Sequence, residues 1–205
     1  MEKLKTSPAE LLKKVPIQTI EQDELNRVFE YLSQQDKNKT ENTDKIGAMD
    51  IAKTLLFLGC RPTKAEVELI IWEVDDDLDG FVSKQEFMTM YKRCISDHAD
   101  LEPRKLFNLV QFLMYDKTLK GRVTVEETLQ ILYVRHGRVM LNHEIQAIFG
   151  EDDTSPDSSE ERSITYGQYV ERINQRALDK HFPDKETLKK RKAEEKKNKS
   201  NDDMF

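Results

Sequence analysis

The sequence has few of the residues that build turn-rich, cross-linked or membrane-spanning proteins. It has 7 Gly and 6 Pro among 205 residues, which argues against a collagen-like chain and against a turn-rich all-β sandwich. Its two cysteines, Cys60 and Cys94, are too few for a disulfide framework and lie in no metal-binding spacing. We expect reduced thiols, with a redox pair as the alternative. No stretch approaches the roughly 18 apolar residues of a membrane span, and residues 1–7 lack the apolar stretch of a signal peptide, so we expect a soluble cytoplasmic protein.

Charged side chains are abundant and unevenly distributed. They make up 35% of the residues, against 37% hydrophobic ones, whereas an ordinary globular domain has roughly 25% charged residues. This composition predicts long, strongly two-faced helices around a thin core. Residues 178–205 contain nine basic and seven acidic side chains, a net charge of +2, so residues 1–177 carry a net charge of −8. The chain is therefore an acidic body with a basic tail.

A pattern of helix, polar loop and helix occurs four times along the chain. Each incoming helix has apolar residues at i, i+3, i+4 and i+7 or part of that spacing, as in the stripe from Leu25 to Leu32. A lone apolar residue follows each polar loop, and these residues recur at intervals of 36, 41 and 41 positions: Ile46, Val82, Val123 and Ile164. The sequence thus contains four copies of a helix-loop-helix unit.

The four units predict an all-α fold made of two lobes. One unit cannot bury its apolar stripe alone, so we expect the units to pair through short two-stranded contacts between their loops, with one small core in each lobe. The pairing residues would be Ile46 with Val82, and Val123 with Ile164. The predicted domains are an N-terminal extension with a short helix (1–17), the first pair (18–95), a linker (96–102), the second pair (103–177) and the basic tail (178–205).

The second loop has the spacing of an oxygen-rich cation site. Residues 75–86 (DDDLDGFVSKQE) match the pattern D-x-D-x-D-G-x5-E. A cation of the size of Ca²⁺ needs about six to eight oxygens, which a tight loop supplies from alternate residues, while Gly80 makes the sharp turn. We predict one Ca²⁺ site here, with Mg²⁺ as a competitor. Its ligands would be the carboxylates of Asp75, Asp77 and Asp79, the backbone carbonyl of Phe81, the hydroxyl or a bound water at Ser83, and both carboxylate oxygens of Glu86.

This loop resembles those of the EF-hand family, and the plan of four repeats in two pairs resembles the calmodulin and centrin group. The resemblance covers about residues 20–175. It implies that ion binding draws Glu86 inward, rotates the following helix and opens a groove for an amphipathic helix of a partner protein. Residues 54–67 (TLLFLGCRPTKAEV) also resemble small EF-hand subunits of ciliary dynein-regulatory and radial-spoke complexes. Calmodulin has a related stretch, so this likeness is only a lead toward the cytoskeleton, a cilium or a flagellar axoneme.

The other three loops depart from the ligand pattern. We expect them to bind no ion and to serve as structural partners in the pairing of the units. The first begins at Lys39 and ends at Asp50, one methylene shorter than glutamate. In the third, Lys120 places an ammonium where a carboxylate should contact the ion, and the repulsion should cost most of the affinity. In the fourth, Arg162 replaces the turning glycine and neutral Gln168 replaces the final acid. The remaining ligand positions are Asp116, Thr118, Arg122, Thr124 and Glu127 in the third loop, and Asp157, Ser159 and Glu161 in the fourth.

Two further features bear on partners. Met88 and Met90 follow Glu86 and either line an adaptable groove or are ordinary core or surface residues.

The lysine-rich tail, which includes Lys189 to Lys192, is a solvated charge run, a contact for an acidic polymer such as the microtubule surface or nucleic acid, or a nuclear targeting patch. No aromatic residue interleaves the lysines, which argues against single-stranded nucleic acid.

These observations favour a calcium-binding regulatory or adaptor subunit that binds a helical segment of a larger assembly. The alternative is a constitutive structural subunit of a ciliary or flagellar microtubule complex with little calcium switching. We do not expect an enzyme, because the four histidines are scattered and the common catalytic motifs are missing from the sequence.

Overall fold

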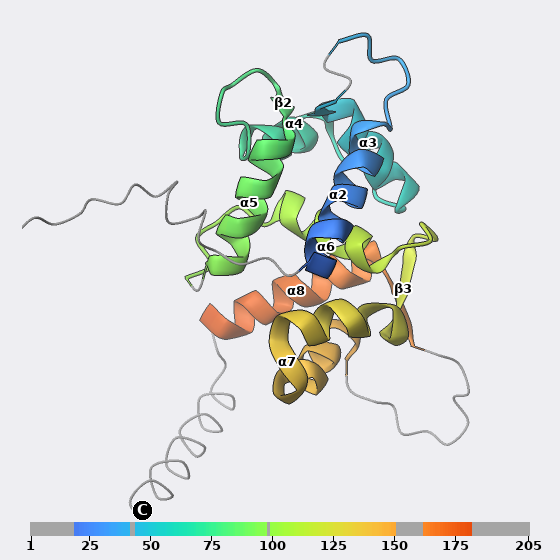
Figure 1. Ribbon diagram of the computed structural model, residues 1–205, viewed down its shortest axis with the longest axis vertical. Helices are drawn as coiled ribbons and strands as arrows, with labels where there is room; N and C mark the ends of the chain where they lie inside the picture. Colours follow the sequence, from blue (N-terminus) through green and yellow to red (C-terminus); the bar gives the residue numbers. More distant parts are fainter. Residues whose placement is uncertain (1–18, 42–43, 98, 151–161, 182–205) are drawn as a thin grey trace, which may run out of the picture.

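The computed structural model describes residues 19–41, 44–97, 99–150 and 162–181. The predicted short helix within 1–17 and most of the basic tail lie outside these ranges. The described part is almost entirely helical, with four strands of two or three residues (Figure 1), which confirms the predicted all-α fold of paired units. None of its helices is long and apolar enough to span a bilayer. The elements are α2 (Thr19–Ser33), β1 (Ile46–Gly47), α3 (Ala48–Phe57), α4 (Lys64–Trp72), β2 (Phe81–Val82), α5 (Lys84–Ser96), α6 (Lys105–Tyr115), β3 (Arg122–Thr124), α7 (Val125–Phe149), β4 (Ser163–Thr165) and α8 (Tyr166–His181).

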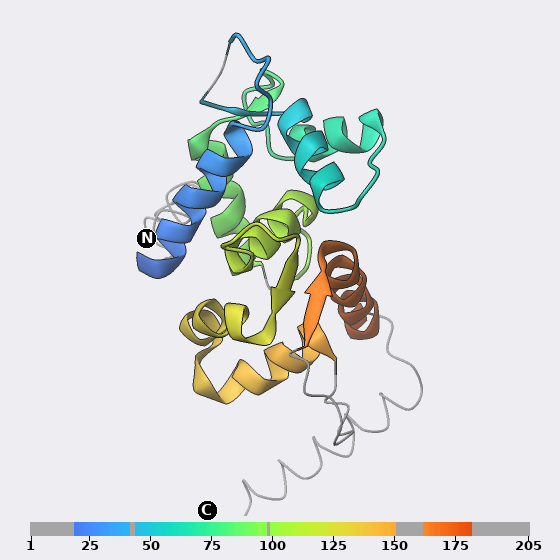
Figure 2. The same cartoon turned by 90° about the vertical axis from the view of Figure 1, so that its right-hand side faces the viewer.

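The strands pair at the lone apolar residues, as the sequence predicts. In the antiparallel pair β1 and β2, Ile46 lies opposite Val82. In the pair β3 and β4, Val123 lies opposite Ile164, and Figure 2 shows these two strands side by side. All four side chains are buried. The pairing fixes the register of the loops, here called loops 1 to 4 after the unit to which each belongs.

Capping boxes set where several helices begin. At α5, the Ser83 hydroxyl accepts a hydrogen bond from the Glu86 amide, and the Glu86 carboxylate accepts one from the Ser83 amide. The same exchange joins Thr63 with Glu66 at the start of α4. These reciprocal bonds satisfy amides that the first helical turn leaves without partners. In α5 the capping acid is also the last residue of loop 2, so one side chain serves both the helix and the loop.

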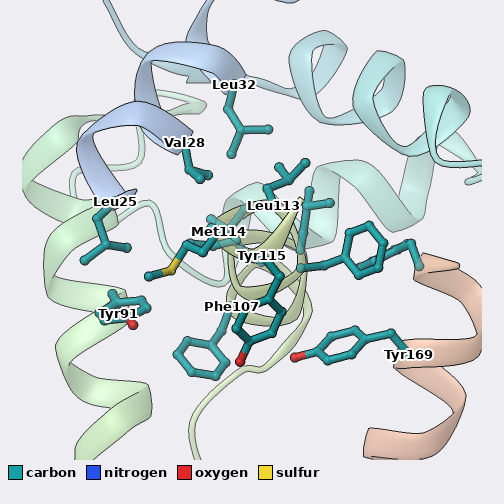
Figure 3. Packing of buried hydrophobic residues seen from close by; sticks show 14 of the residues in the cluster. Leu25, Val28, Leu32, Tyr91, Phe107, Leu113, Met114, Tyr115 and Tyr169 are labelled. Carbon is teal, nitrogen blue, oxygen red and sulfur yellow. The ribbon is translucent and has the colours of Figure 1, made fainter. Parts of the chain in front are cut away.

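The hydrophobic core differs from the expectation of one small core per lobe. Helix α6 lies between the helices of the first half and those of the second (Figure 1), and it contacts α2, α4, α5, α7 and α8. Every residue from Leu106 to Tyr115 is buried, including Asn108 and Gln111. Figure 3 shows α6 residues packed between Leu25 of α2, Tyr91 of α5 and Tyr169 of α8. The buried residues therefore form one cluster across both halves, while the lobe boundaries at 18–95 and 103–177 stay a prediction.

A buried polar network also joins the two halves. The Arg135 guanidinium on α7 donates to the Glu21 carboxylate on α2 at 2.6 Å. The Tyr91 hydroxyl on α5 donates to the same Glu21 oxygen at 3.1 Å, and it accepts a hydrogen bond from Gln111 of α6 at 3.3 Å. Burial raises the pKa of Tyr91. Four helices from both halves thus meet at one cluster of charged and polar groups.

Helix α7 joins the third and fourth units directly, so no separate loop lies between them. It bends at Gly137, where φ is +70° and the backbone is not helical. A left-handed φ is accessible to glycine at little cost, so a glycine at this position permits the bend. The outgoing helix of the third unit lies before the bend, and the incoming helix of the fourth unit lies after it.

The two cysteines are free thiols, and we predict that they differ in reactivity. Burial raises the pKa of Cys94 to about 12 and also raises that of Cys60, which is more exposed. Because the thiolate is the reacting form, iodoacetamide should alkylate Cys60 well before Cys94 in the folded protein. Mass spectrometry of timed samples would measure both rates, and equal rates at the two residues would contradict the buried position of Cys94.

Candidate metal centre

Loop 2 brings three of the predicted ligands together. Carboxylate oxygens of Asp75, Asp77 and Glu86 all lie within 4.8 Å of one another. Asp75 and Glu86 are only 7% and 8% exposed. Burying carboxylates close to one another is costly unless a cation or hydrogen-bond donors compensate the charge. Loop 2 therefore brings negative charges together at a place that is largely shielded from solvent.

Backbone amides of the loop orient two of these carboxylates. The Asp75 carboxylate accepts hydrogen bonds from the amides of Asp79 at 3.2 Å and Gly80 at 2.8 Å. The Glu86 carboxylate accepts from Asp76 at 2.9 Å and from Ser83 at 2.8 Å. Gly80 has a φ of +83°, a left-handed conformation that glycine adopts without a steric penalty. The first and last acids of the loop are thus held in place by its own backbone.

The other predicted ligands have different surroundings. Asp79 accepts hydrogen bonds from the Lys45 ammonium of loop 1 and from the Phe81 amide. Phe81 lies in β2, opposite Gly47. The Ser83 hydroxyl donates to Glu86 at 2.7 Å as part of the helix cap. Because its hydroxyl is engaged in this way, Ser83 suits contact with the ion through a bound water, one of the two options predicted for it.

Lys45 modifies the electrostatics of the site. Its hydrogen bond to Asp79 holds the pKa of that carboxyl below its ordinary value and raises the pKa of the lysine. The pKa of Asp77 is raised, first by desolvation and then by the negative charges of Asp79 and Glu86. The donor set consists of oxygens alone, which suits a hard divalent cation such as Ca²⁺ or Mg²⁺ rather than a thiophilic metal. The residues of loop 2 therefore fit the predicted ion.

Loop 3 keeps the shape of loop 2 but contains a lysine at the predicted point of conflict. Buried Asp116 accepts hydrogen bonds from the amides of Lys120 at 2.9 Å and Gly121 at 2.7 Å. The ammonium of Lys120 lies 3.3 Å from a carboxylate oxygen of Glu127. It thereby pairs with the acid that would otherwise bind an ion through both oxygens. This contact agrees with the expectation that loop 3 has a structural role and binds no ion.

Loop 4 lies only partly within the described residues. Asp157, Ser159 and Glu161 fall outside them, so their predicted positions stay a prediction. At the last position, the Gln168 side chain accepts a hydrogen bond from the Thr165 amide at 2.9 Å and so caps α8. The Arg162 guanidinium donates to the Gly150 carbonyl at 3.0 Å. The neutral amide of Gln168 supplies the cap without supplying a charge for an ion.

Loop 1 contains a contact that the sequence interpretation missed. Asp50, its last residue, is fully buried, and its carboxylate binds the ammonium of Lys39 at 2.5 Å. From the sequence, Lys39 is only the first residue of a loop that is expected to bind no ion. The sequence places Lys39 at the first position of this loop and Asp50 at its last position, but that spacing does not show where the ammonium points.

Comparisons with known proteins agree with this geometry. A family model described as an EF-hand domain pair matches residues 43–94, which include loop 2 and its neighbouring helices. Residues 43–94 thus match an EF-hand domain pair, and the chain is similar to calmodulin-like proteins. It is similar to calmodulin-like protein 4 of Mus musculus, with 27% identity over 154 residues that cover 75% of the chain and 93% of the mouse protein.

A second relative gives a shorter match. The probable calcium-binding protein CML27 of Arabidopsis thaliana is 28% identical over 110 residues, which cover 54% of this chain. The match spans only 56% of the plant protein. The EF-hand resemblance seen in the sequence is therefore confirmed.

The methionines of this EF-hand pair lie in or against the core. Met90 is 5% exposed, and the partly buried Met88 accepts a hydrogen bond from the Gln22 side chain on α2 at 3.6 Å. A groove of about 510 Å³ lies elsewhere, between α3 and α4 on one side and α6 and α8 on the other. Its apolar lining includes Leu55, Pro62, Ile70, Leu109, Tyr166 and Val170.

Proposed function

We propose that this chain is a calcium-binding regulatory or adaptor subunit that binds a helical segment of a larger protein assembly. The observation that carries the proposal is the convergence of the Asp75, Asp77 and Glu86 carboxylates in loop 2. Two of the three are nearly buried, so their charge calls for a cation in this place. The proposed ligands are those predicted from the sequence: Asp75, Asp77, Asp79, Phe81, Ser83 and Glu86.

The position of Glu86 links the site to the core. A bound divalent cation would compensate the negative charge of the converging carboxylates. Glu86 lies in the first turn of α5, and the same helix carries Phe87 and Tyr91, which are fully buried. A displacement of α5 at its first turn would therefore disturb the contacts of Phe87 with Phe29 and of Tyr91 with Glu21. The 510 Å³ groove between α4 and α6 supports a partner helix as the target.

Calorimetric titration with Ca²⁺ tests the proposal. We expect about one equivalent of tightly bound Ca²⁺ with a dissociation constant on the order of 10⁻⁷ to 10⁻⁵ M, the range of EF-hand sensors. Trp72 is 66% exposed at the end of α4, shortly before Asp75, so its fluorescence should change if the loop rearranges. A chelator-treated protein that shows no binding heat up to millimolar Ca²⁺ would contradict the proposal.

Lys45→Met is predicted to raise the affinity for Ca²⁺. The ammonium holds Asp79 and lies 4.0 Å from Asp77, so an incoming cation must displace it and is repelled by it. We expect the dissociation constant to fall by about two- to tenfold, an effect typical of a partly exposed ion pair. Calorimetry would compare it with Lys53→Met, which removes the same charge from a pair with Asp36 outside loop 2. Equal affinities in the two variants would show that Lys45 does not oppose binding.

The second candidate is a constitutive structural subunit of a ciliary or flagellar microtubule complex. Helix α6, buried between both halves, favours a protein with limited freedom to open. The likeness of residues 54–67 to small axonemal subunits and the basic composition of the tail support the microtubule assignment. Calcium binding without any change in Trp72 fluorescence would favour this candidate over the switch. Purification of the native complex would identify the partner in either case.

A further inference from the structure

Loop 1 is filled by a cation that belongs to the chain itself. The ammonium of Lys39 donates to the Asp50 carboxylate at 2.5 Å, to the Lys45 carbonyl at 2.7 Å and to the Ser33 carbonyl at 3.1 Å. The Lys39 side chain is only 8% exposed. We propose that this ammonium takes the place in loop 1 that a metal ion takes in a metal-binding loop, so that the loop is permanently occupied.

The strand register shows that these contacts involve ligand positions. Ile46 lies opposite Val82, so Lys45, one residue earlier, corresponds to Phe81, the predicted carbonyl ligand of loop 2. Asp50 follows Ile46 by four residues, as Glu86 follows Val82. Lys39 therefore binds the equivalents of the backbone-carbonyl ligand and of the final acid. Two of the oxygens that would face an ion in loop 1 face the ammonium instead.

Backbone amides also hold the final acids of both loops, and Gly47 and Ser83 are equivalent in the strand register. Asp50 accepts from the Gly47 amide at 2.8 Å, just as Glu86 accepts from the Ser83 amide at 2.8 Å. The second oxygen of Asp50 accepts from the Asp36 amide at 2.6 Å, and that of Glu86 accepts from the Asp76 amide at 2.9 Å. In both loops each oxygen of the final acid accepts a backbone amide, although Asp36 lies before loop 1 whereas Asp76 lies within loop 2.

The Lys39 ammonium compensates the negative charge of the buried Asp50 carboxylate and donates a hydrogen bond to it. Asp50 is fully buried, and an unpaired carboxylate there would be strongly destabilising. A lysine ammonium is a compact charge with three donors, and Lys39 has an acceptor for each of them. This arrangement keeps loop 1 in shape without a metal, so β1 stays available to pair with β2 beside the calcium loop.

The test uses the full chain in the presence of a chelator, so its outcome does not depend on calcium binding by loop 2. Lys39→Ala should lower the thermal midpoint by roughly 5 °C or more, whereas Lys53→Ala should change it by about 2 °C or less, because the Lys53 pair is partly exposed. Ethylammonium chloride should then raise the midpoint of Lys39→Ala more than that of the unmodified chain, because it can refill the cavity and restore the charge. Tetramethylammonium chloride, which cannot donate hydrogen bonds, should give no such difference.

Two results would overturn the inference: a Lys39→Ala midpoint no lower than that of Lys53→Ala, or equal responses to the two ammonium salts. Should Lys39→Ala fail to fold, the double variant Lys39→Met/Asp50→Asn decides, because it removes both buried charges together. The single variants for comparison are Lys39→Met and Asp50→Asn. We expect the double variant to be more stable than whichever of these two is the less stable. A double variant that loses as much as the two single changes combined would show that the ammonium and the carboxylate are not coupled.

Discussion

Glu86→Gln is expected to weaken calcium binding by roughly 100-fold or more, because the final acid of the loop supplies two oxygens and a full negative charge. The amide keeps the size of the side chain and one oxygen that can accept from the Ser83 amide, as Glu86 does now at 2.8 Å. The start of α5 should therefore remain capped. Calorimetric titration measures the affinity, and circular dichroism checks that the helical content is unchanged.

Glu127→Gln is the matched control for this prediction. Glu127 is the last residue of loop 3 and caps α7 through the Thr124 amide at 2.9 Å, so the same chemical change is made in the same local structure. Because Lys120 already pairs with Glu127, the variant should bind calcium like the unmodified chain. A similar loss of affinity in both variants would mean that loop 3 takes part in binding and that the ranking of the loops is wrong.

Arg135→Met is expected to lower the free energy of unfolding by about 3 to 5 kcal/mol, the usual cost of leaving one partner of a buried ion pair alone. The Glu21 carboxylate is 5% exposed and would keep only the Tyr91 hydroxyl as a donor from this network. Urea denaturation in the presence of a chelator, followed by circular dichroism, measures the loss.

Two further variants separate the buried network from charge effects in general. Lys64→Met removes a lysine from an exposed pair with Glu68 and should cost less than about 1 kcal/mol. The double variant Glu21→Gln/Arg135→Met removes both buried charges and should recover a large part of the loss. If Arg135→Met is no more costly than Lys64→Met, the network does not hold the two halves together.

The network also places a limit on how the calcium loop can act. Tyr91 lies on α5, the helix that begins at loop 2, and it contacts Glu21, Gln111 and Arg135 from three other helices. Any movement of α5 therefore has to break or shift these bonds. Calcium affinity and the stability of the junction between the halves should be linked for this reason.

Local features of this chain were predictable from the order of its residues. The lone apolar residues after each loop identified both strand pairs, because a residue that faces the core must pair with its counterpart in the neighbouring unit. The capping box of Thr63 and Glu66 is a local pattern of the same kind, and it stands at the start of α4. The spacing of Asp75, Asp77 and Glu86 identified three carboxylates that the structure brings together. In each case the interaction spans a few residues or repeats in a regular way.

The position of α6 could not be derived with the same certainty. Its sequence, KLFNLVQFLMY, is apolar nearly all round, which is typical of a helix buried on every side, whereas the two-lobe prediction rests on only one of its apolar stripes. Burial of Asn108 and Gln111 depends on neighbours from distant parts of the chain. Likewise Met90 packs in the core and Met88 contacts Gln22 of α2, and the sequence alone does not show which faces of α5 are covered.

By itself, the sequence determined the four helix-loop-helix units, the pairing of their loops and the one loop with a full set of acidic ligands, because these follow from spacing along the chain. Only the tertiary structure decided that the halves share one core, that Arg135 reaches Glu21 across it, and that Lys39 fills loop 1. Those contacts join residues whose side-chain directions depend on the packing of several helices. Side-chain direction is the information that spacing does not contain.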